Sequence, residues 1–231
     1  MTRQASKLAR AGLLVSGLAL LASCTSDGSS AAERLGPLAE EVIFGKQDPE
    51  PPQVLTRAEL AQVPFATLAI STPGGPRSYV AAVANNDGFV AYQDQSRRSI
   101  IMEGGMLVAT HGLGYDLAAI KHQPDDPVAL QTPVSQWPGV VVRNYQFTRT
   151  GTTDYQVTVS CSFQKTARER IEIVELFFDV QRIDETCGNG KRSFTNTYWV
   201  AVDTGFIWKS VQWIGPRQPD PFVLEVIRPI G

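Results

Sequence analysis

From residue 65 to the C-terminus the sequence alternates between short β-type segments and turn residues, and this alternation limits the chain to an all-β fold. The segments are rich in Val, Ile, Tyr, Phe and Thr, whereas Pro, Gly, Asn and Asp gather between them and permit tight turns. We predict one antiparallel β-barrel or sandwich of about ten strands, at residues 65–71, 79–84, 88–93, 99–103, 106–110, 140–149, 155–164, 170–183, 194–202, 206–213 and 222–227.

Helix-forming sequence is confined to the part of the chain before these segments. Residues 31–44 contain helix formers that Gly36-Pro37 interrupts. Thr56 and Glu59 have the spacing of a capping box, which opens a helix that Pro64 must end. One or two short N-terminal helices are therefore expected.

The first 23 residues have the pattern of a secretion signal. Arg3, Lys7 and Arg10 precede an apolar run at 11–22, which is too short to span a bilayer as a helix. The run ends in Leu-Ala-Ser-Cys, which resembles the bacterial lipobox, where Cys24 is acylated and the chain is cut before it. A plain signal peptide with a chance cysteine is the alternative interpretation.

The lipobox implies an exported protein that is anchored by lipid. We expect residues 1–23 to be removed, residues 24–32 to form the lipidated cysteine and its tether, and residues 33–231 to form a single all-β domain. Several acyl chains, palmitate among them, make such an anchor effectively permanent. By resemblance to lipoprotein sorting rules, Thr25 favours the outer membrane, and a periplasm-facing position is expected.

The remaining two cysteines are predicted to form a disulfide. Lipidation uses Cys24 and leaves Cys161 and Cys187, which lie in a protein expected to reach an oxidising compartment. A reactive thiol, the alternative, would need a neighbouring base and no partner cysteine.

Composition argues against several classes of function. The 21 Lys and Arg against 23 Asp and Glu give a net charge of −2, which offers no excess of positive charge for nucleic-acid phosphates. Two histidines and three cysteines are too few for a zinc ribbon or an iron–sulfur cluster, so no metal or cofactor is expected. Asp125-Asp126 lies between prolines without a spaced acidic series, which favours a solvated loop over a calcium site.

Few residues have the pattern of a catalytic site. His111 lies close to Asp116 in a glycine-rich segment, so a general base oriented by a carboxylate is one interpretation. No nucleophile motif such as Gly-x-Ser-x-Gly accompanies it, which favours a turn histidine at the end of a strand. We predict that the protein is not an enzyme, and a polysaccharide-modifying enzyme is the alternative.

An aromatic cluster near the C-terminus is the most suggestive binding feature. Its residues lie on two predicted strands joined by Asp203-Thr204-Gly205. Aromatic rings stack on the apolar faces of sugars, and polar neighbours bind the hydroxyl groups. Core packing and cross-strand aromatic pairs are the other interpretation. The candidate surface for a glycan or a partner protein consists of Asn196, Tyr198, Trp199, Trp208, Lys209, Gln212 and Trp213.

Three segments resemble a known family. They are MLVATHGLGYDL at 106–117, FTNTYWV at 194–200 and IWKSVQWI at 207–214. With the lipobox and the cysteine pair, they resemble the YjbF/GfcB lipoproteins, the group 4 capsule polysaccharide lipoprotein family, over nearly the whole mature chain. By this resemblance, many relatives are expected to have Arg at the position of His111.

The resemblance implies an all-β outer-membrane lipoprotein with a non-enzymatic, accessory role in exopolysaccharide or capsule production and export. Exopolysaccharide and other polysaccharide-export proteins are the implied partners. The family supplies no catalytic residue. A carrier of an apolar ligand in the cell envelope is a further alternative, which other envelope lipoproteins exemplify.

Overall fold

The computed structural model describes residues 55–149, 152–218 and 220–230, and the bounds and counts below refer to these residues. The predictions for the signal segment, Cys24, the tether and the helix at 31–44 lie outside them. In the described part, no helix is long and apolar enough to cross a membrane.

Twelve antiparallel strands form one sheet in the described residues, in the order β5-β4-β3-β2-β1-β12-β11-β10-β9-β8-β7-β6. Neighbours in the sheet are neighbours in sequence, except that β1 pairs with β12. The bounds are β1 Thr67–Ser71, β2 Ser78–Asn86, β3 Phe89–Gln93, β4 Ser99–Glu103, β5 Met106–His111, β6 Tyr115–His122, β7 Val140–Arg149, β8 Thr152–Ile173, β9 Leu176–Gly188, β10 Ser193–Val200, β11 Ile207–Gln212 and β12 Phe222–Arg228. The all-β prediction is confirmed.

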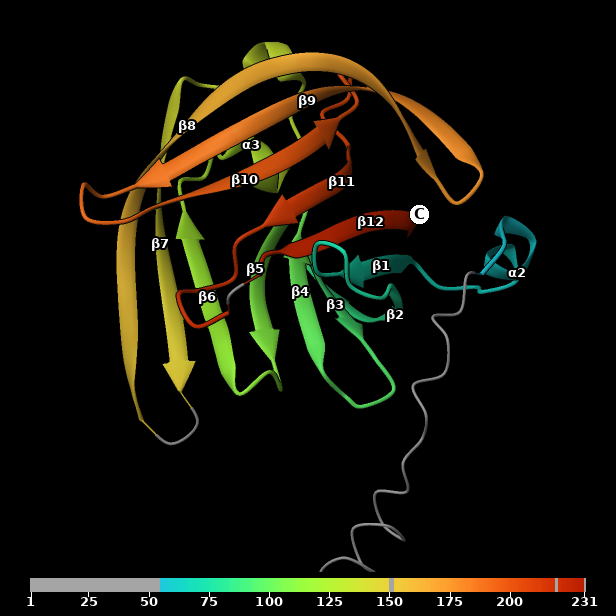
Figure 1. Cartoon of the computed structure of the whole chain (residues 1–231), viewed down its shortest axis with the longest axis horizontal. Helices are drawn as coiled ribbons and strands as arrows, with labels where there is room; N and C mark the ends of the chain where they lie inside the picture. Colours follow the sequence, from blue (N-terminus) through green and yellow to red (C-terminus); the bar gives the residue numbers. More distant parts are fainter. Residues whose placement is uncertain (1–54, 150–151, 219, 231) are drawn as a thin grey trace, which may run out of the picture. The chain divides into compact units, whose positions relative to one another are not determined.

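The sheet curves until its edge strands, β5 and β6, lie beside each other, so that the barrel is nearly closed (Figure 1). Thr110 Oγ1 of β5 accepts a hydrogen bond from Leu117 N of β6 at 3.0 Å. From across the barrel, Gln212 Oε1 accepts from Leu107 N at 3.0 Å, and Gln212 Nε2 donates to Gly105 O at 2.9 Å. Side chains thus bind edge groups that a further strand would otherwise pair.

Two strand predictions are wrong in detail. Residues 115–122 form β6, which was not predicted, and the predicted strand 170–183 is divided by a turn between β8 and β9. That turn contains Val174 at φ 41° and Glu175 at φ 65°. Turns with two positive φ values normally use Asn or Gly, so this sequence carries no turn signal.

The distal part of the β8–β9 hairpin reaches the N-terminal helix α2 (Arg57–Ala61), as Figure 1 shows. The guanidinium of Arg57 donates to the carbonyls of Ile173, Val174 and Ile227 at 3.1, 3.1 and 2.9 Å. A second, small core forms there from Leu60, Ala69, Ile173 and Ile227, with Phe178 and Trp208 packed against it. The hairpin tip is therefore held by both polar and apolar contacts.

The predicted capping box is confirmed at the start of α2. Thr56 Oγ1 accepts from Glu59 N, and the Glu59 carboxylate accepts from Thr56 N.

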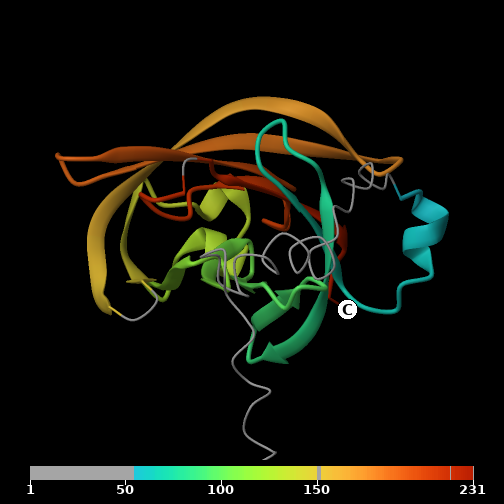
Figure 2. The same cartoon turned by 60° about the horizontal axis from the view of Figure 1, so that its bottom comes forward.

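The main core lies inside the curve of the sheet, where α3 (Pro127–Leu130) and a 3-10 turn, η1 (Val134–Gln136), also pack (Figure 2).

The predicted disulfide is confirmed: Cys161 of β8 and Cys187 of β9 are register partners joined by a sulfur–sulfur bond. Both residues are fully buried. The bridge therefore strengthens the hairpin where it is part of the barrel wall.

Replacing both cysteines with Ala should lower the free energy of unfolding by about 3.5 kcal/mol, because the bridge closes a loop between residues 26 positions apart. Urea unfolding of the oxidised domain that starts after Cys24 measures this loss. Thiol labelling of the same domain, denatured but not reduced, should detect no free thiol, and two reactive thiols would contradict the assignment.

Candidate functional site

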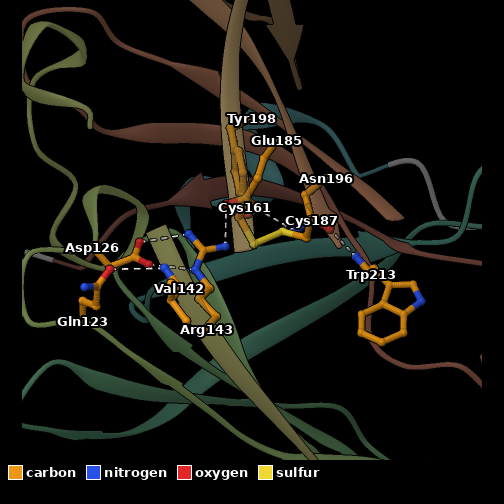
Figure 3. The surroundings of a disulfide bond; sticks show 10 residues. All are labelled: Gln123, Asp126, Val142, Arg143, Cys161, Glu185, Cys187, Asn196, Tyr198 and Trp213. Carbon is orange, nitrogen blue, oxygen red and sulfur yellow. Dashed lines mark hydrogen bonds and ion pairs between the residues drawn. A yellow bond between two sulfur atoms is a disulfide. The ribbon is translucent and has the colours of Figure 1, made fainter. Parts of the chain in front are cut away.

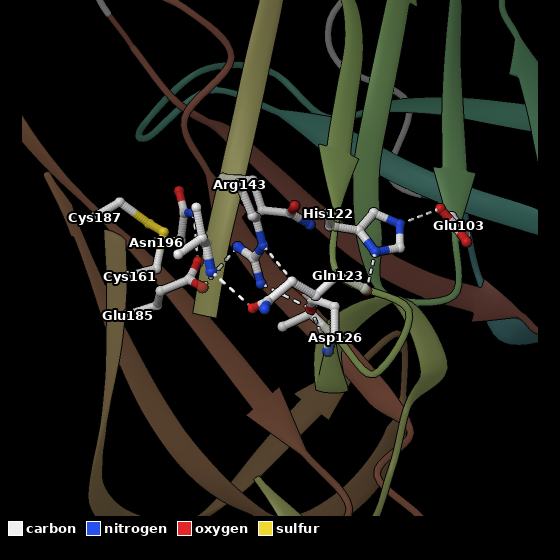
Figure 4. A network of polar contacts seen from close by, with 12 residues as sticks. Glu103, His122, Gln123, Asp126, Arg143, Cys161, Glu185, Cys187 and Asn196 are labelled. Carbon is white, nitrogen blue, oxygen red and sulfur yellow. Dashed lines mark hydrogen bonds and ion pairs between the residues drawn. A yellow bond between two sulfur atoms is a disulfide. The ribbon is translucent and has the colours of Figure 1, made fainter. Parts of the chain in front are cut away.

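Arg143 of β7 is fully buried in the half of the barrel formed by β6–β10, where carboxylates compensate its charge (Figure 4). Its Nε and Nη2 donate to Asp126 at 2.7 and 3.0 Å, and its Nη1 lies 2.6 Å from Glu185 Oε1. Asp126 also caps α3 by accepting from Val128 N at 3.0 Å. The interpretation of a solvated loop is therefore wrong for Asp126, while Asp125 is exposed.

Glu185 extends this network to β10 (Figure 3). Its Oε2 accepts from Asn196 Nδ2 at 2.8 Å and from Tyr198 OH at 2.9 Å, and Asn196 Oδ1 accepts from Trp213 N at 2.8 Å. The disulfide sulfurs lie close enough to Glu185 for a metal-ligand group. Because these sulfurs are bonded to each other, we assign no metal to this group.

Burial and the neighbouring charges together hold the main groups of this network in one protonation state. Burial raises the pKa of Tyr145 to about 12 and, together with the Glu185 charge, raises the pKa of Tyr198 well above its ordinary value. Burial alone would lower the pKa of Arg143. The charge of Glu185 and the hydrogen bonds to Asp126 outweigh this effect, so the pKa is raised well above its ordinary value. A charged Arg and two neutral Tyr suit structural support better than proton transfer.

The seven residues of the predicted binding surface lie on both sides of the sheet. Three of them point into the barrel and are buried, namely Asn196, Tyr198 and Gln212. Trp213 packs against Phe194 with ring centroids 4.1 Å apart. These four residues belong to the core side of β10 and β11.

The other three residues lie elsewhere around β10 and β11. Trp199 Nε1 donates to Glu169 at 2.9 Å, and the Lys209 ammonium lies 5.4 Å from the Trp199 ring. Trp208 stacks on Phe178 with ring centroids 3.8 Å apart. Of the seven, Trp208 and Lys209 border a cleft.

His111 and Asp116 lie at the two ends of the link between β5 and β6. The Asp116 carboxylate accepts hydrogen bonds from Thr110 Oγ1, Gly112 N and Leu113 N at 3.0 to 3.1 Å, whereas His111 is exposed. Asp116 thus holds the conformation of this link.

The half of the barrel formed by β1–β5, β11 and β12 contains a wide cleft of about 460 Å³. The turns β2–β3 and β4–β5, helix α3 and the start of β11 surround it. Its volume falls within the range of small-molecule sites, about 300 to 1,000 Å³. Aromatic and polar side chains gather along it, namely Tyr92, Phe206, Trp208, Asn85, Asp87, Glu103, Gln131, Lys209 and Ser210.

His122 orients the Glu103 carboxylate beside this cleft (Figure 4). His122 Nε2 lies 2.7 Å from Glu103 Oε2, and Nδ1 lies 2.8 Å from Gln123 O. Because both ring nitrogens face acceptors, the protonated ring can donate to both. Burial lowers the pKa of His122, but these bonds and the charges of Glu103 and Asp126 outweigh it, so the pKa is raised.

A second, narrow cleft of about 240 Å³ borders the loops β1–β2, β3–β4 and β5–β6. In antiparallel strands these loops lie at the opposite end from the turns around the wide cleft. Its walls are mostly apolar, and hydroxyl groups and one ion pair, Arg98–Asp94, lie among its lining residues. Tyr92 borders both clefts.

Sequence reasoning missed these clefts and the Arg143 network. Arg143 occupies the same face of its strand as Val141, Tyr145 and Phe147, which all point into the barrel. A charged residue at an alternating position that is otherwise apolar was therefore the signal that the sequence offered. The residues around the wide cleft come from separate turns and strands, and Asp87 carries only an ordinary turn signal.

Comparisons with known proteins identify one family and one solved structure of the same fold. The family described as group 4 capsule polysaccharide lipoprotein GfcB, YjbF matches residues 37–220. The uncharacterized lipoprotein YjbF of Escherichia coli (strain K12) is 25% identical over 201 residues, which cover 85% of this chain and 87% of that protein. The crystal structure of the hypothetical lipoprotein YmcC from Escherichia coli (K12) has a TM-score of 0.67 at 16% identity, covering 89% of this chain and 99% of that one, and shares the fold.

Replacing Arg143 with Met should lower the free energy of unfolding by about 3 to 5 kcal/mol, because two buried carboxylates lose their counter-charge. Urea unfolding measures the change. Adding Asp126→Asn and Glu185→Gln should recover part of the loss, since the three side chains act as one network. Strictly additive losses would contradict this coupling.

The raised pKa of His122 predicts a pH-dependent contribution to stability. This contribution is complete below the unfolded pKa of about 6.5 and disappears as the pH rises through the higher folded pKa. The difference in unfolding free energy between wild type and His122→Gln should therefore be larger at about pH 6 than at about pH 8. NMR titration of the ring resonances checks the pKa directly, and a value below 6.5 for His122 would refute the prediction.

Proposed function

We propose a function from the premise that this chain belongs to the group 4 capsule polysaccharide lipoprotein family (GfcB, YjbF). The protein is an outer-membrane lipoprotein that faces the periplasm, anchored by diacylglycerol and palmitate on Cys24. It has a non-enzymatic, accessory role in the production or export of capsule or exopolysaccharide, and it binds the glycan in the wide cleft.

The lining of the wide cleft is the observation that supports glycan binding. Carboxylates and amides accept from and donate to sugar hydroxyls, and Asn85, Asp87, Glu103 and Gln131 supply these groups. Phe206 adds an aromatic face next to Trp208, with ring centroids 4.6 Å apart. The family's connection with capsule polysaccharide agrees with a saccharide as the ligand.

An enzymatic role gains less support from the geometry. The Asp116 carboxylate already accepts three hydrogen bonds from the link that contains His111. Glu103 Oε2 already lies 2.7 Å from His122 Nε2, so this carboxylate also has a partner. A His111→Ala variant should therefore restore polysaccharide production in a deletion strain as well as wild type does.

The proposal predicts how a strain lacking the gene responds to complementation. Wild type should restore surface polysaccharide, whereas Cys24→Ala and the double variant Asp87→Gly with Glu103→Ala should not. Gly adopts the φ of 49° at residue 87 without strain, so the turn is kept. Purified double variant should also bind the isolated polysaccharide at least about tenfold more weakly, since hydrogen bonds to charged groups contribute about 1.5 to 3 kcal/mol each.

The matched control is the double variant Glu172→Ala with Asp179→Ala, which removes two exposed carboxylates from the β8–β9 hairpin. It should complement and bind as wild type does. Unchanged polysaccharide in the deletion strain would refute the role in polysaccharide production. Complementation by a wide-cleft variant that no longer binds glycan would indicate an export protein as the partner instead.

A further inference from the structure

The two clefts follow one another along the inner face of the same strands. Three strands each give one residue to the narrow cleft and the residue two positions away to the wide cleft: Ile70 and Leu68 on β1, Ile100 and Met102 on β4, and Phe222 and Leu224 on β12. Residues two apart on a strand point the same way and are about 7 Å apart. The clefts are therefore successive parts of one lumen.

Tyr92 separates these two parts. It borders both clefts from β3, and only 5% of its surface is exposed. Its neighbours on the same face are Val90 in the wide cleft and, across the β3–β4 pair, Ile100 in the narrow cleft. Among the described residues, Tyr92 is the one that lines both clefts, so it marks where they meet.

The narrow cleft has the chemistry of a hydrocarbon site. Its lining contains the apolar side chains of Ile70, Val80, Ile100, Leu113 and Phe222, and four residues with hydroxyl groups, Ser71, Thr72, Ser78 and Ser99. The charged groups in its lining, Arg98 and Asp94, pair with each other at 2.7 Å and leave no net charge. Apolar walls with hydroxyls but no uncompensated charge favour an uncharged aliphatic chain.

The wide cleft has the chemistry of a neutral, hydroxyl-bearing group. Asp87 brings a carboxylate to it that none of the described ion pairs compensates, whereas Glu103 lies 2.7 Å from His122 Nε2 and the Lys209 ammonium lies 2.9 Å from the Glu225 carboxylate. An anionic sugar would meet like charge there, whereas neutral hydroxyls can donate to both carboxylates.

We infer that the two clefts form one binding site for a neutral saccharide that carries a hydrocarbon chain. The saccharide occupies the wide cleft and the chain passes Tyr92 into the narrow cleft. This inference rests on the proposed saccharide binding and extends it to a lipid-linked form of the saccharide.

Binding of n-alkyl glucosides to the purified domain tests the inference. The series from hexyl to dodecyl, used below the micelle concentrations, is compared with n-alkanols of the same chain lengths and with n-alkyl glucuronides. Once the chain passes Tyr92, affinity should rise about fourfold per added methylene. Each glucoside should bind at least about tenfold more tightly than its alkanol, because the alkanol leaves the polar groups of the wide cleft without partners. Glucuronides should bind more weakly than glucosides.

Two matched variants separate the parts of the site. Leu113→Trp narrows the hydrocarbon cleft from a half-buried loop position, and Leu130→Trp narrows the wide cleft from a side chain that is 54% exposed. With Leu113→Trp, the affinity for n-alkyl glucosides should rise less than about twofold per added methylene, and glucosides should still bind more tightly than alkanols. Leu130→Trp should remove the preference for glucosides and keep the chain-length dependence.

The outcomes distinguish this inference from the function on which it rests. Glucosides that bind more tightly than alkanols, but with no dependence on chain length, would overturn the inference and leave saccharide binding intact. Alkanols that bind as tightly as glucosides would overturn both. Glucuronides that bind more tightly than glucosides would overturn the assignment of a neutral saccharide.

Discussion

The buried guanidinium of Arg143 is the interaction on which the interior of the barrel depends. A charge with no exposed surface requires counter-charges at hydrogen-bonding distance, and these come from the α3 cap at Asp126 and from Glu185 on β9. The ion pairs of Arg143 with Asp126 and Glu185 therefore hold α3 inside the barrel and align β7 with β9 and β10. Helix α3 in turn forms one side of the wide cleft. The Arg143 network in the half formed by β6–β10 therefore helps to shape the cleft in the other half of the barrel.

Local chemistry was sufficient to predict the class of fold. The capping box at Thr56 follows from spacing, and the pairing of Cys161 with Cys187 follows from the count of cysteines and the expected compartment; the structure contains both. The turn at Val174-Glu175 could not be predicted, because its positive φ values are imposed by the packed hairpin tip and by Arg57 instead of by turn residues.

The candidate site was less predictable than the fold. The aromatic cluster divides between the two faces of the sheet because Tyr198 and Trp199 are consecutive on β10. On β11, a bulge at Trp208 changes the phase of the strand. Alternation rules assume an uninterrupted strand, so they cannot assign such a residue to a face. Trp208 reaches the wide cleft, while Tyr198 lies with the buried network. Distant turns such as that of Asp87 meet only when the barrel closes.

Gln212 binds the backbone of β5 from across the lumen, in the place where a further strand would otherwise pair. Members of a lipoprotein family are concentrated in the plane of a membrane, where copies meet far more often than in free solution. Exposed sheet edges under such crowding would act as templates for intermolecular β-sheet. The described strands turn their two edges toward each other, so that these edges are not offered to neighbouring copies as templates.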